Sequence, residues 1–145
     1  MNNWTILIRL MLTIVLSGAI GSDRQLKGAA AGLRTNMLVG LGGCLASLMA
    51  IFLIGNCGFT EPGQMTRVLQ GVLTGLGFLG AGCIIAQKGK VIGLTSAAAI
   101  WTTSIIGMLV GLGFYFMSIA ATILVVFVLF ILKFAETKWL TPEGD

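Results

Sequence analysis

Residues that could carry out chemistry are scarce in this chain of 145 residues. It has no histidine, and its three cysteines, Cys44, Cys57 and Cys83, lack the spacing of a zinc site or a disulfide scaffold. No nucleophile has a base beside it, and no phosphate-binding loop is present. The segment Gly75–Gly82 imitates a dinucleotide-binding fingerprint, but the strand–helix–strand context and the acidic partner downstream are missing. We therefore expect no enzymatic activity.

One polar cluster interrupts the apolar sequence. Its candidate site residues are Asp23, Arg24, Gln25, Arg34, Thr35 and Asn36. Asp23 is the only candidate metal ligand. Mg²⁺ prefers carboxylate oxygens, and Asp23 is the only acidic residue close to the membrane-buried part on the predicted inner side. Lys27 lies four residues later, a spacing that favours an ion pair if the helix continues. Thr35 or Asn36 could cap the next helix.

Two interpretations of this cluster stay open. In the first, its basic residues only set the orientation in a membrane, and Asp23 is a solvated partner. In the second, the cluster forms a polar mouth under the bundle, with Asp23 bridging Arg24 or Arg34. The composition of the segment fits both.

Glycines and hydroxyl groups form a second set of candidates. With about 100° per residue, the helix predicted after Val68 has one small or polar half and one bulky half that includes Leu76. We expect a partner helix on the small half and acyl chains on the bulky half. The candidates for helix packing, or for a polar pathway, are Gln70, Gly71, Thr74, Gly75, Gly77, Gly80, Gly82, Thr95, Ser96, Thr102 and Thr103.

The following helix repeats this division. Its predicted small and hydroxylated side comprises Thr95, Ser96, Ala99, Thr102, Thr103, Gly107 and Gly111. Its predicted lipid-facing stripe comprises Trp101, Ile105, Met108 and Leu112. Hydroxyl groups on such faces either line a pathway or form hydrogen bonds between helices.

The composition requires a membrane protein. The chain is 57% hydrophobic and 10% charged, with a mean hydropathy of +1.00. Long uncharged runs of this kind cross about 30 Å of hydrocarbon as helices. We predict an all-α, polytopic bundle with five spans, the first of them retained rather than cleaved as a signal peptide. The spans are about Trp4–Gly21, Asn36–Gly55, Val68–Ala86, Thr95–Gly113 and Phe114–Leu132.

Charge sets the expected orientation. Placing the first and third connectors and the carboxyl-terminal tail in the cytoplasm puts seven of the nine basic residues inside. The amino terminus is then outside, residues 1–135 form one transmembrane domain, and residues 136–145 form a short cytoplasmic tail. Arg9 must reach the outer surface or pair within the bundle. The net charge of +4 is a topology signal and does not indicate nucleic-acid binding.

A hexamer, MLVGLG, occurs twice, at Met37–Gly42 and at Met108–Gly113. Both copies lie in spans that run in the same direction in the predicted topology. This is consistent with a parallel duplication of a helix pair. Chance recurrence in a sequence rich in glycine and leucine is the competing explanation.

Four linked motifs carry a resemblance to the MgtC/SapB family. They are IGSDRQ, AGLRTNMLVGLG, LQGVLTGLGFLGAGCI and GLTSAAAIW, and the resemblance spans roughly residues 10–125. The family usually has Glu where this chain has Asp23, and Thr-Thr or Asn-Thr where it has Thr95–Ser96. The chain resembles the membrane domain alone, so we expect a short member without the soluble carboxyl-terminal domain that some members carry.

The resemblance implies a bacterial protein of the cytoplasmic (inner) membrane, linked to magnesium limitation, acid stress and virulence. It also implies regulation through helix contacts with a membrane partner such as ATP synthase. The alternative is a channel or transporter for Mg²⁺ or another cation. No cofactor is expected, apart from a Mg²⁺ ion at Asp23 in that alternative. We expect lipid as the surrounding partner, a homo-oligomer with a dimer favoured, and no nucleic acid.

Overall fold

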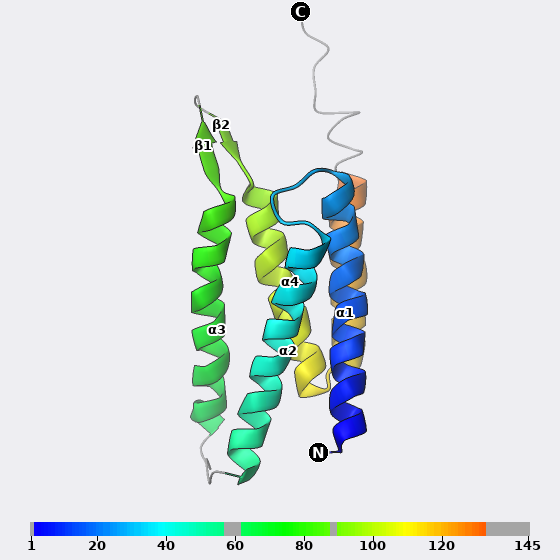
Figure 1. Cartoon of the computed structure of the whole chain (residues 1–145), viewed down its shortest axis with the longest axis vertical. Helices are drawn as coiled ribbons and strands as arrows, with labels where there is room; N and C mark the ends of the chain where they lie inside the picture. Colours follow the sequence, from blue (N-terminus) through cyan, green and yellow to red (C-terminus); the bar gives the residue numbers. More distant parts are fainter. Residues whose placement is uncertain (1, 57–61, 88–89, 133–145) are drawn as a thin grey trace, which may run out of the picture.

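The computed structural model describes residues 2–56, 62–87 and 90–132, and it confirms an all-α bundle (Figure 1). Five α-helices run alternately up and down: α1 (Asn3–Leu26), α2 (Leu33–Asn56), α3 (Pro62–Cys83), α4 (Leu94–Leu112) and α5 (Tyr115–Phe127). A short π-helix, η1 (Val128–Leu132), continues α5. Cys57, Lys88, Lys133, Lys138 and the predicted tail at residues 136–145 lie outside the described residues.

Three of the described helices are long and apolar enough to cross a membrane, namely α1, α2 and α4. The helix at α5 is apolar but shorter. The predicted third span is displaced, because α3 begins at Pro62 and ends at Cys83. Polar residues in its first turns, among them Gln64 and Arg67, lower its hydropathy. The count of five helices is therefore confirmed, and the third boundary is corrected.

The predicted third connector, between α3 and α4, contains a β-hairpin. Strand β1 (Ile85–Gln87) pairs in antiparallel register with β2 (Lys90–Ile92), with Ile85 opposite Ile92. The β-branched residues on both sides of the connection favour extended backbone. Gly93 then has a φ of 90° and is the N-cap of α4. A side chain there would collide with the carbonyl oxygen of Cys83, so this position requires glycine.

Close backbone packing joins α2 to α4, and this is the part of the small-residue prediction that the structure confirms. A Cβ atom at Gly107 would collide with the carbonyl oxygen of Gly40, and one at Gly111 would lie 2.6 Å from the carbonyl oxygen of Cys44. Ser96, Ala99 and Thr103 of the predicted small side are also buried. Met108, predicted to face lipid, is instead buried at 5% exposure, because this helix is packed on more than one side.

The prediction that the bulky half of α3 faces acyl chains is wrong. Leu76, expected to face acyl chains, is 8% exposed and packs with Ala31 and Ile100. A Cβ atom built at Gly71, Gly75, Gly77 or Gly82 meets nothing within 4 Å. The bulky half of α3 therefore turns towards the bundle, and the small half faces outward. Among the α3 glycines predicted for helix packing, Gly80 is the buried one, and it packs against Ala97 of α4.

The turn between α4 and α5 lies at the predicted boundary between the fourth and fifth spans. Gly113 has a φ of 93° and ends α4. Arg9 of α1 reaches this turn and donates hydrogen bonds to the Gly111 carbonyl oxygen at 2.7 Å and to the Tyr115 hydroxyl at 3.0 Å. Of the two alternatives for Arg9, pairing within the bundle is confirmed. A cation near the carboxyl end of a helix is electrostatically favourable.

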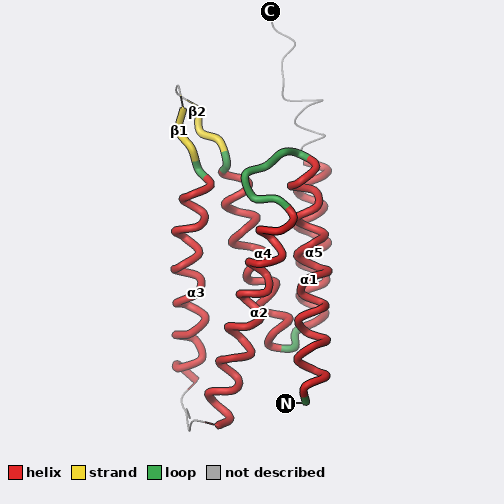
Figure 2. Tube along the Cα trace, viewed as in Figure 1, coloured by secondary structure: helices red, strands yellow, loops and turns green. Residues whose placement is uncertain are grey.

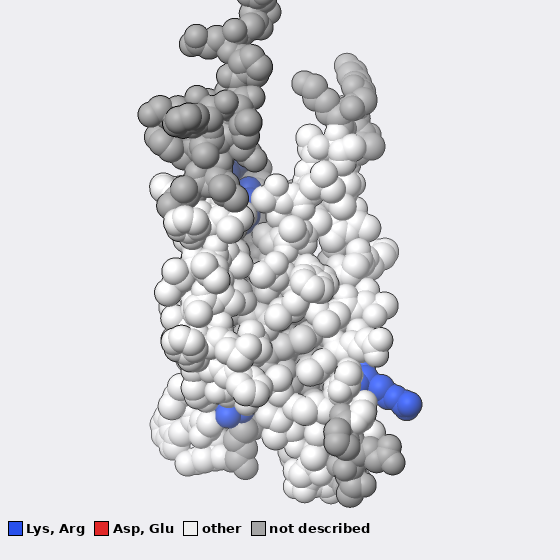
Figure 3. All heavy atoms as spheres, turned by 180° about the vertical axis from the view of Figure 1, so that it is seen from behind, with Lys and Arg blue, Asp and Glu red and all other residues white. Residues whose placement is uncertain are grey.

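The connectors sort to two ends of the bundle. The α1–α2 loop and the hairpin lie at one end, and the amino terminus lies at the other (Figure 2). On the face seen in Figure 3, the basic atoms lie towards these ends, and the middle of that face shows neither basic nor acidic atoms. Arg24, Lys27 and Arg34 lie at the end of α1 or the start of α2, so they share the hairpin end, as the predicted topology requires. The side of the membrane that this end faces stays a prediction.

Candidate functional site

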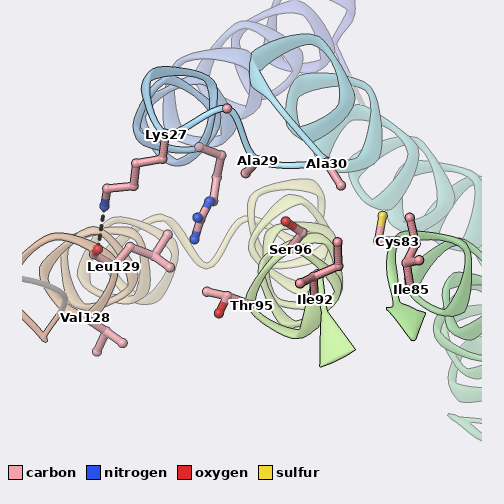
Figure 4. A pocket seen from close by; sticks show the side chains of 13 residues that line it. Lys27, Ala29, Ala30, Cys83, Ile85, Ile92, Thr95, Ser96, Val128 and Leu129 are labelled. Atoms are coloured by element: carbon pink, nitrogen blue, oxygen red, sulfur yellow. Dashed lines mark hydrogen bonds between the residues drawn. The ribbon is translucent and has the colours of Figure 1, made fainter. Parts of the chain in front are cut away.

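A cavity of about 700 Å³ lies at the hairpin end of the bundle. Four parts of the chain form it: the end of α1 with the loop that follows, the hairpin with the last residue of α3, the start of α4, and η1 (Figure 4). Its lining residues are Arg24, Lys27, Gly28, Ala29, Ala30, Cys83, Ile85, Ile92, Gly93, Thr95, Ser96, Val128 and Leu129.

Asp23 and Lys27 form an ion pair at this end. Lys27 Nζ lies 2.6 Å from Asp23 Oδ1, one helical turn away on α1. The same ammonium group donates a hydrogen bond to the Leu129 carbonyl oxygen at 2.7 Å, which Figure 4 shows. The i,i+4 ion pair is confirmed, and the solvated Asp23 of the first interpretation is wrong, since this residue is 9% exposed. Lys27 also ties α1 to η1.

Arg24 is the second buried charge, also at 9% exposure. Its Nε has no hydrogen-bond partner, and neither has Asp23 Oδ2. The predicted bridge from Asp23 to Arg24 or Arg34 is not formed among the described residues, because Lys27 occupies the carboxylate. Arg34 is exposed on α2. The polar mouth of the second interpretation therefore exists in part, with Lys27 in the role predicted for an arginine.

The other residues of the predicted cluster separate. Gln25 accepts the N–H of Leu33, the first residue of α2, at 3.4 Å, and Thr35 is exposed. Asn36 is completely buried and donates to the carbonyl oxygens of Ala31 and Gly32 at 3.1 and 2.9 Å. It therefore does not cap α2 through the N–H groups of the first turn.

Asn36 also joins the second set of candidates. Its Oδ1 accepts a hydrogen bond from Thr103 Oγ1 of α4 at 3.1 Å. Among the predicted hydroxyl groups in the described part of the chain, Thr103 alone forms a side-chain hydrogen bond to another helix. Thr74 and Thr102 donate instead to carbonyl oxygens of their own helices, Gln70 and Ala98.

The predicted pathway residues do not come together. Thr95 and Ser96 line the cavity beside the hairpin. Gln70, Gly71, Thr74, Gly75, Gly77 and Gly82 lie on the exposed side of α3. Thr103 is buried between α2 and α4, with Asn36. The set thus divides into an outward face, a buried contact and part of a cavity wall.

Two features were missed from the sequence. Phe78 is 84% exposed and lies on α3 between the glycines, three residues after Gly75 and four before Gly82. Its helical spacing could have placed it on the small face. The cavity itself was missed because its walls come from four segments that are distant in the sequence.

Metal ligands are sparse in the described part of the chain. No group of three or more His, Cys, Asp or Glu residues could hold an ion there. One carboxylate oxygen of Asp23, the predicted candidate, is paired with the Lys27 ammonium group. A Mg²⁺ ion at this position would have to displace that ammonium group or bind through Oδ2 alone.

The bundle of apolar helices defines a membrane protein, and comparison with known proteins assigns its family. The MgtC family model matches residues 10–138. The chain therefore belongs to the MgtC family. No solved structure matches it with significance.

Three curated relatives illustrate the similarity. "Putative magnesium transporter YhiD" of Escherichia coli K12 is 38% identical over 130 residues, which cover 85% of this chain and 58% of YhiD. "Protein SrpB" of Synechococcus elongatus is 37% identical over 122 residues, covering 79% and 67%. "Protein MgtC" of Salmonella typhimurium is 37% identical over 119 residues, covering 82% and 48%. The chain thus spans about half the length of MgtC and somewhat more of YhiD.

Proposed function

We propose that this protein regulates other proteins of the bacterial inner membrane through contacts between helices, and that α3 supplies the contact surface. The observation that carries the proposal is the open small-residue side of α3. Gly71, Gly75 and Gly82 have no atom within 4 Å of an added Cβ, although Gly107 and Gly111 on α4 are tightly covered. We name the exposed side of α3 the α3 outer face; its residues are Gly71, Thr74, Gly75, Phe78 and Gly82.

Physical chemistry explains why such a face would bind a helix. The hydrophobic effect drives little association between helices inside lipid. Helices therefore associate where small side chains allow their backbones to approach closely. On the α3 outer face, Phe78 projects from a surface of small residues. A partner helix can lie along the glycines while the phenyl ring packs beside it. The α2–α4 contact of this same chain uses the same device.

The partner proposed is a transmembrane helix of the membrane sector of ATP synthase, which the family resemblance implies. A second copy of the chain is the competing occupant, in keeping with the expected homodimer. Contact with a membrane subunit of the synthase would restrict the movement of that subunit's helices and so lower the activity of the synthase.

Site-specific photo-cross-linking tests this proposal. A benzoylphenylalanine at position 78 should form a defined adduct with an ATP synthase membrane subunit in living cells. The matched control is position 116, where Phe116 of α5 is 85% exposed against 84% for Phe78. An adduct between two copies would instead assign the face to self-association. Identical adduct patterns from positions 78 and 116 would reject α3 as a specific contact surface.

Transport of Mg²⁺ or another cation is the second candidate function. Its support is the name of the Escherichia coli relative, "Putative magnesium transporter YhiD", and the buried carboxylate of Asp23. Liposomes with purified protein should then pass Mg²⁺ faster than empty liposomes, and Asp23→Asn should abolish that flux. Flux equal to that of empty liposomes would leave the regulatory function as the account of this chain.

A further inference from the structure

The cavity beside the hairpin holds an unbalanced buried cation. Arg24 lines the cavity and is only 9% exposed. Its Nε has no hydrogen-bond partner. Lys27 also lines the cavity, but its charge is balanced by Asp23 at 2.6 Å. A buried guanidinium group is costly unless an anion accepts its hydrogen bonds. The cavity therefore contains a charged hydrogen-bond donor, the Arg24 guanidinium group, for which the described residues supply no acceptor at Nε.

The start of α4 adds donors to the same cavity. Its N-cap is Gly93, which provides no side-chain cap, and Ala97 is the first residue whose N–H bonds back, to the Gly93 carbonyl oxygen at 3.0 Å. The preceding N–H groups of the first turn have no intrahelical acceptor. Gly93, Thr95 and Ser96 all line the cavity. The partial positive charge of a helix N-terminus and its open N–H groups favour bound anions.

We propose that this cavity binds a phosphate group, held by the Arg24 guanidinium and by the N-terminal turn of α4 with the hydroxyl groups of Thr95 and Ser96. A tetrahedral phosphate accepts hydrogen bonds from both sources at once, and arginine matches its oxygens in a bidentate manner. The phosphate could belong to an anionic phospholipid or to a soluble phosphate compound. Both sources present the same oxyanion.

The rest of the cavity wall suits a phospholipid better than a free ion. Ile85, Ile92, Val128 and Leu129 bring apolar side chains to the lining (Figure 4). These surfaces can cover glycerol and acyl carbons while the headgroup reaches the basic side. Basic pockets between helices at the membrane surface bind lipid headgroups in this manner. None of the lining residues belongs to the α3 outer face, so the site does not depend on the regulatory proposal.

Thermal unfolding of the full chain, purified in a neutral maltoside detergent, tests the site. Short-chain phosphatidylglycerol should raise the unfolding temperature more than phosphatidylcholine does, and titration gives its affinity. Arg24→Gln should weaken that affinity about tenfold or more, as expected for a charge-assisted hydrogen bond. The matched control is Arg34→Gln, which removes the same charge from an exposed residue at the same end, and it should bind as the wild type does.

The arms of the experiment separate the sources. A response to phosphatidylglycerol but not to inorganic phosphate assigns a lipid headgroup, whereas responses to both, each lost in Arg24→Gln, assign a soluble phosphate ligand as well. Equal weakening by Arg24→Gln and Arg34→Gln, or no response to either probe, overturns the site. If Arg24→Gln does not fold, the near-isosteric pair Thr95→Val and Ser96→Ala should still weaken binding severalfold. Unchanged affinity in that variant overturns it too.

Discussion

Thr103 of α4 donates a hydrogen bond to Oδ1 of Asn36 of α2 at 3.1 Å, and both side chains are completely buried. Asn36 also donates to the carbonyl oxygens of Ala31 and Gly32, the last two residues of the loop before α2. One asparagine therefore fixes the end of the α1–α2 loop and the position of α4. Among helices held mainly by close packing, a polar contact of this kind specifies how the helices align.

Replacing Thr103 by valine tests that contact. The variant keeps the shape of the side chain but leaves Asn36 Oδ1 without its donor. We expect a loss of about 1–2 kcal/mol in the free energy of unfolding, measured by denaturation in mixed micelles. Thr102→Val is the control, because Thr102 donates only to Ala98 of its own helix, and it should change stability by less than about 0.5 kcal/mol. Equal effects would show that the bond between helices contributes nothing of its own.

Gly107→Ala should damage the bundle itself. The added methyl group would occupy the position of the Gly40 carbonyl oxygen, so α2 and α4 must separate. We expect a loss of about 1–3 kcal/mol or more, measured by the unfolding temperature. Gly42→Ala, whose new methyl group meets nothing within 4 Å, should be neutral or stabilising by up to about 1 kcal/mol. A Gly107→Ala protein as stable as the wild type would contradict the close α2–α4 contact.

Leu76→Ala should also be severe, against the expectation from sequence. Leu76 is 8% exposed within a cluster that includes Ala31 and Ile100. Removing its side chain should cost about 2–5 kcal/mol, the range for a buried leucine. Leu79→Ala, at a half-exposed position of the same helix, should cost less than about 1 kcal/mol. If the two variants unfold alike, the bulky half of α3 does not face the bundle.

The sequence was sufficient to predict most of the fold. Five apolar segments, the glycine turn before Tyr115 and the small side of α4 could all be predicted, because each depends on local composition or on helical period. The pairing of Asp23 with a basic residue one turn away followed from the same period. These features need no knowledge of distant contacts.

The orientation of α3 could not be predicted in the same way. Periodicity separates Gly75 from Leu76 but does not say which side meets the other helices, since small and bulky faces both pack well in lipid. The hairpin was missed because Ile84 and Ile85 continue the apolar run of α3. The Arg24 cavity needs four segments to meet, and no single stretch of sequence encodes that meeting.

The central claim is that the α3 outer face is a contact surface for another helix. ATP synthesis in inverted membrane vesicles tests it directly, with wild type, Gly75→Leu and Gly42→Leu expressed at equal levels. Neither glycine has a neighbour within 4 Å of an added Cβ, so both variants should fold. We predict that wild type and Gly42→Leu lower the rate of ATP synthesis and that Gly75→Leu does not. Equal inhibition by all three proteins would contradict the claim.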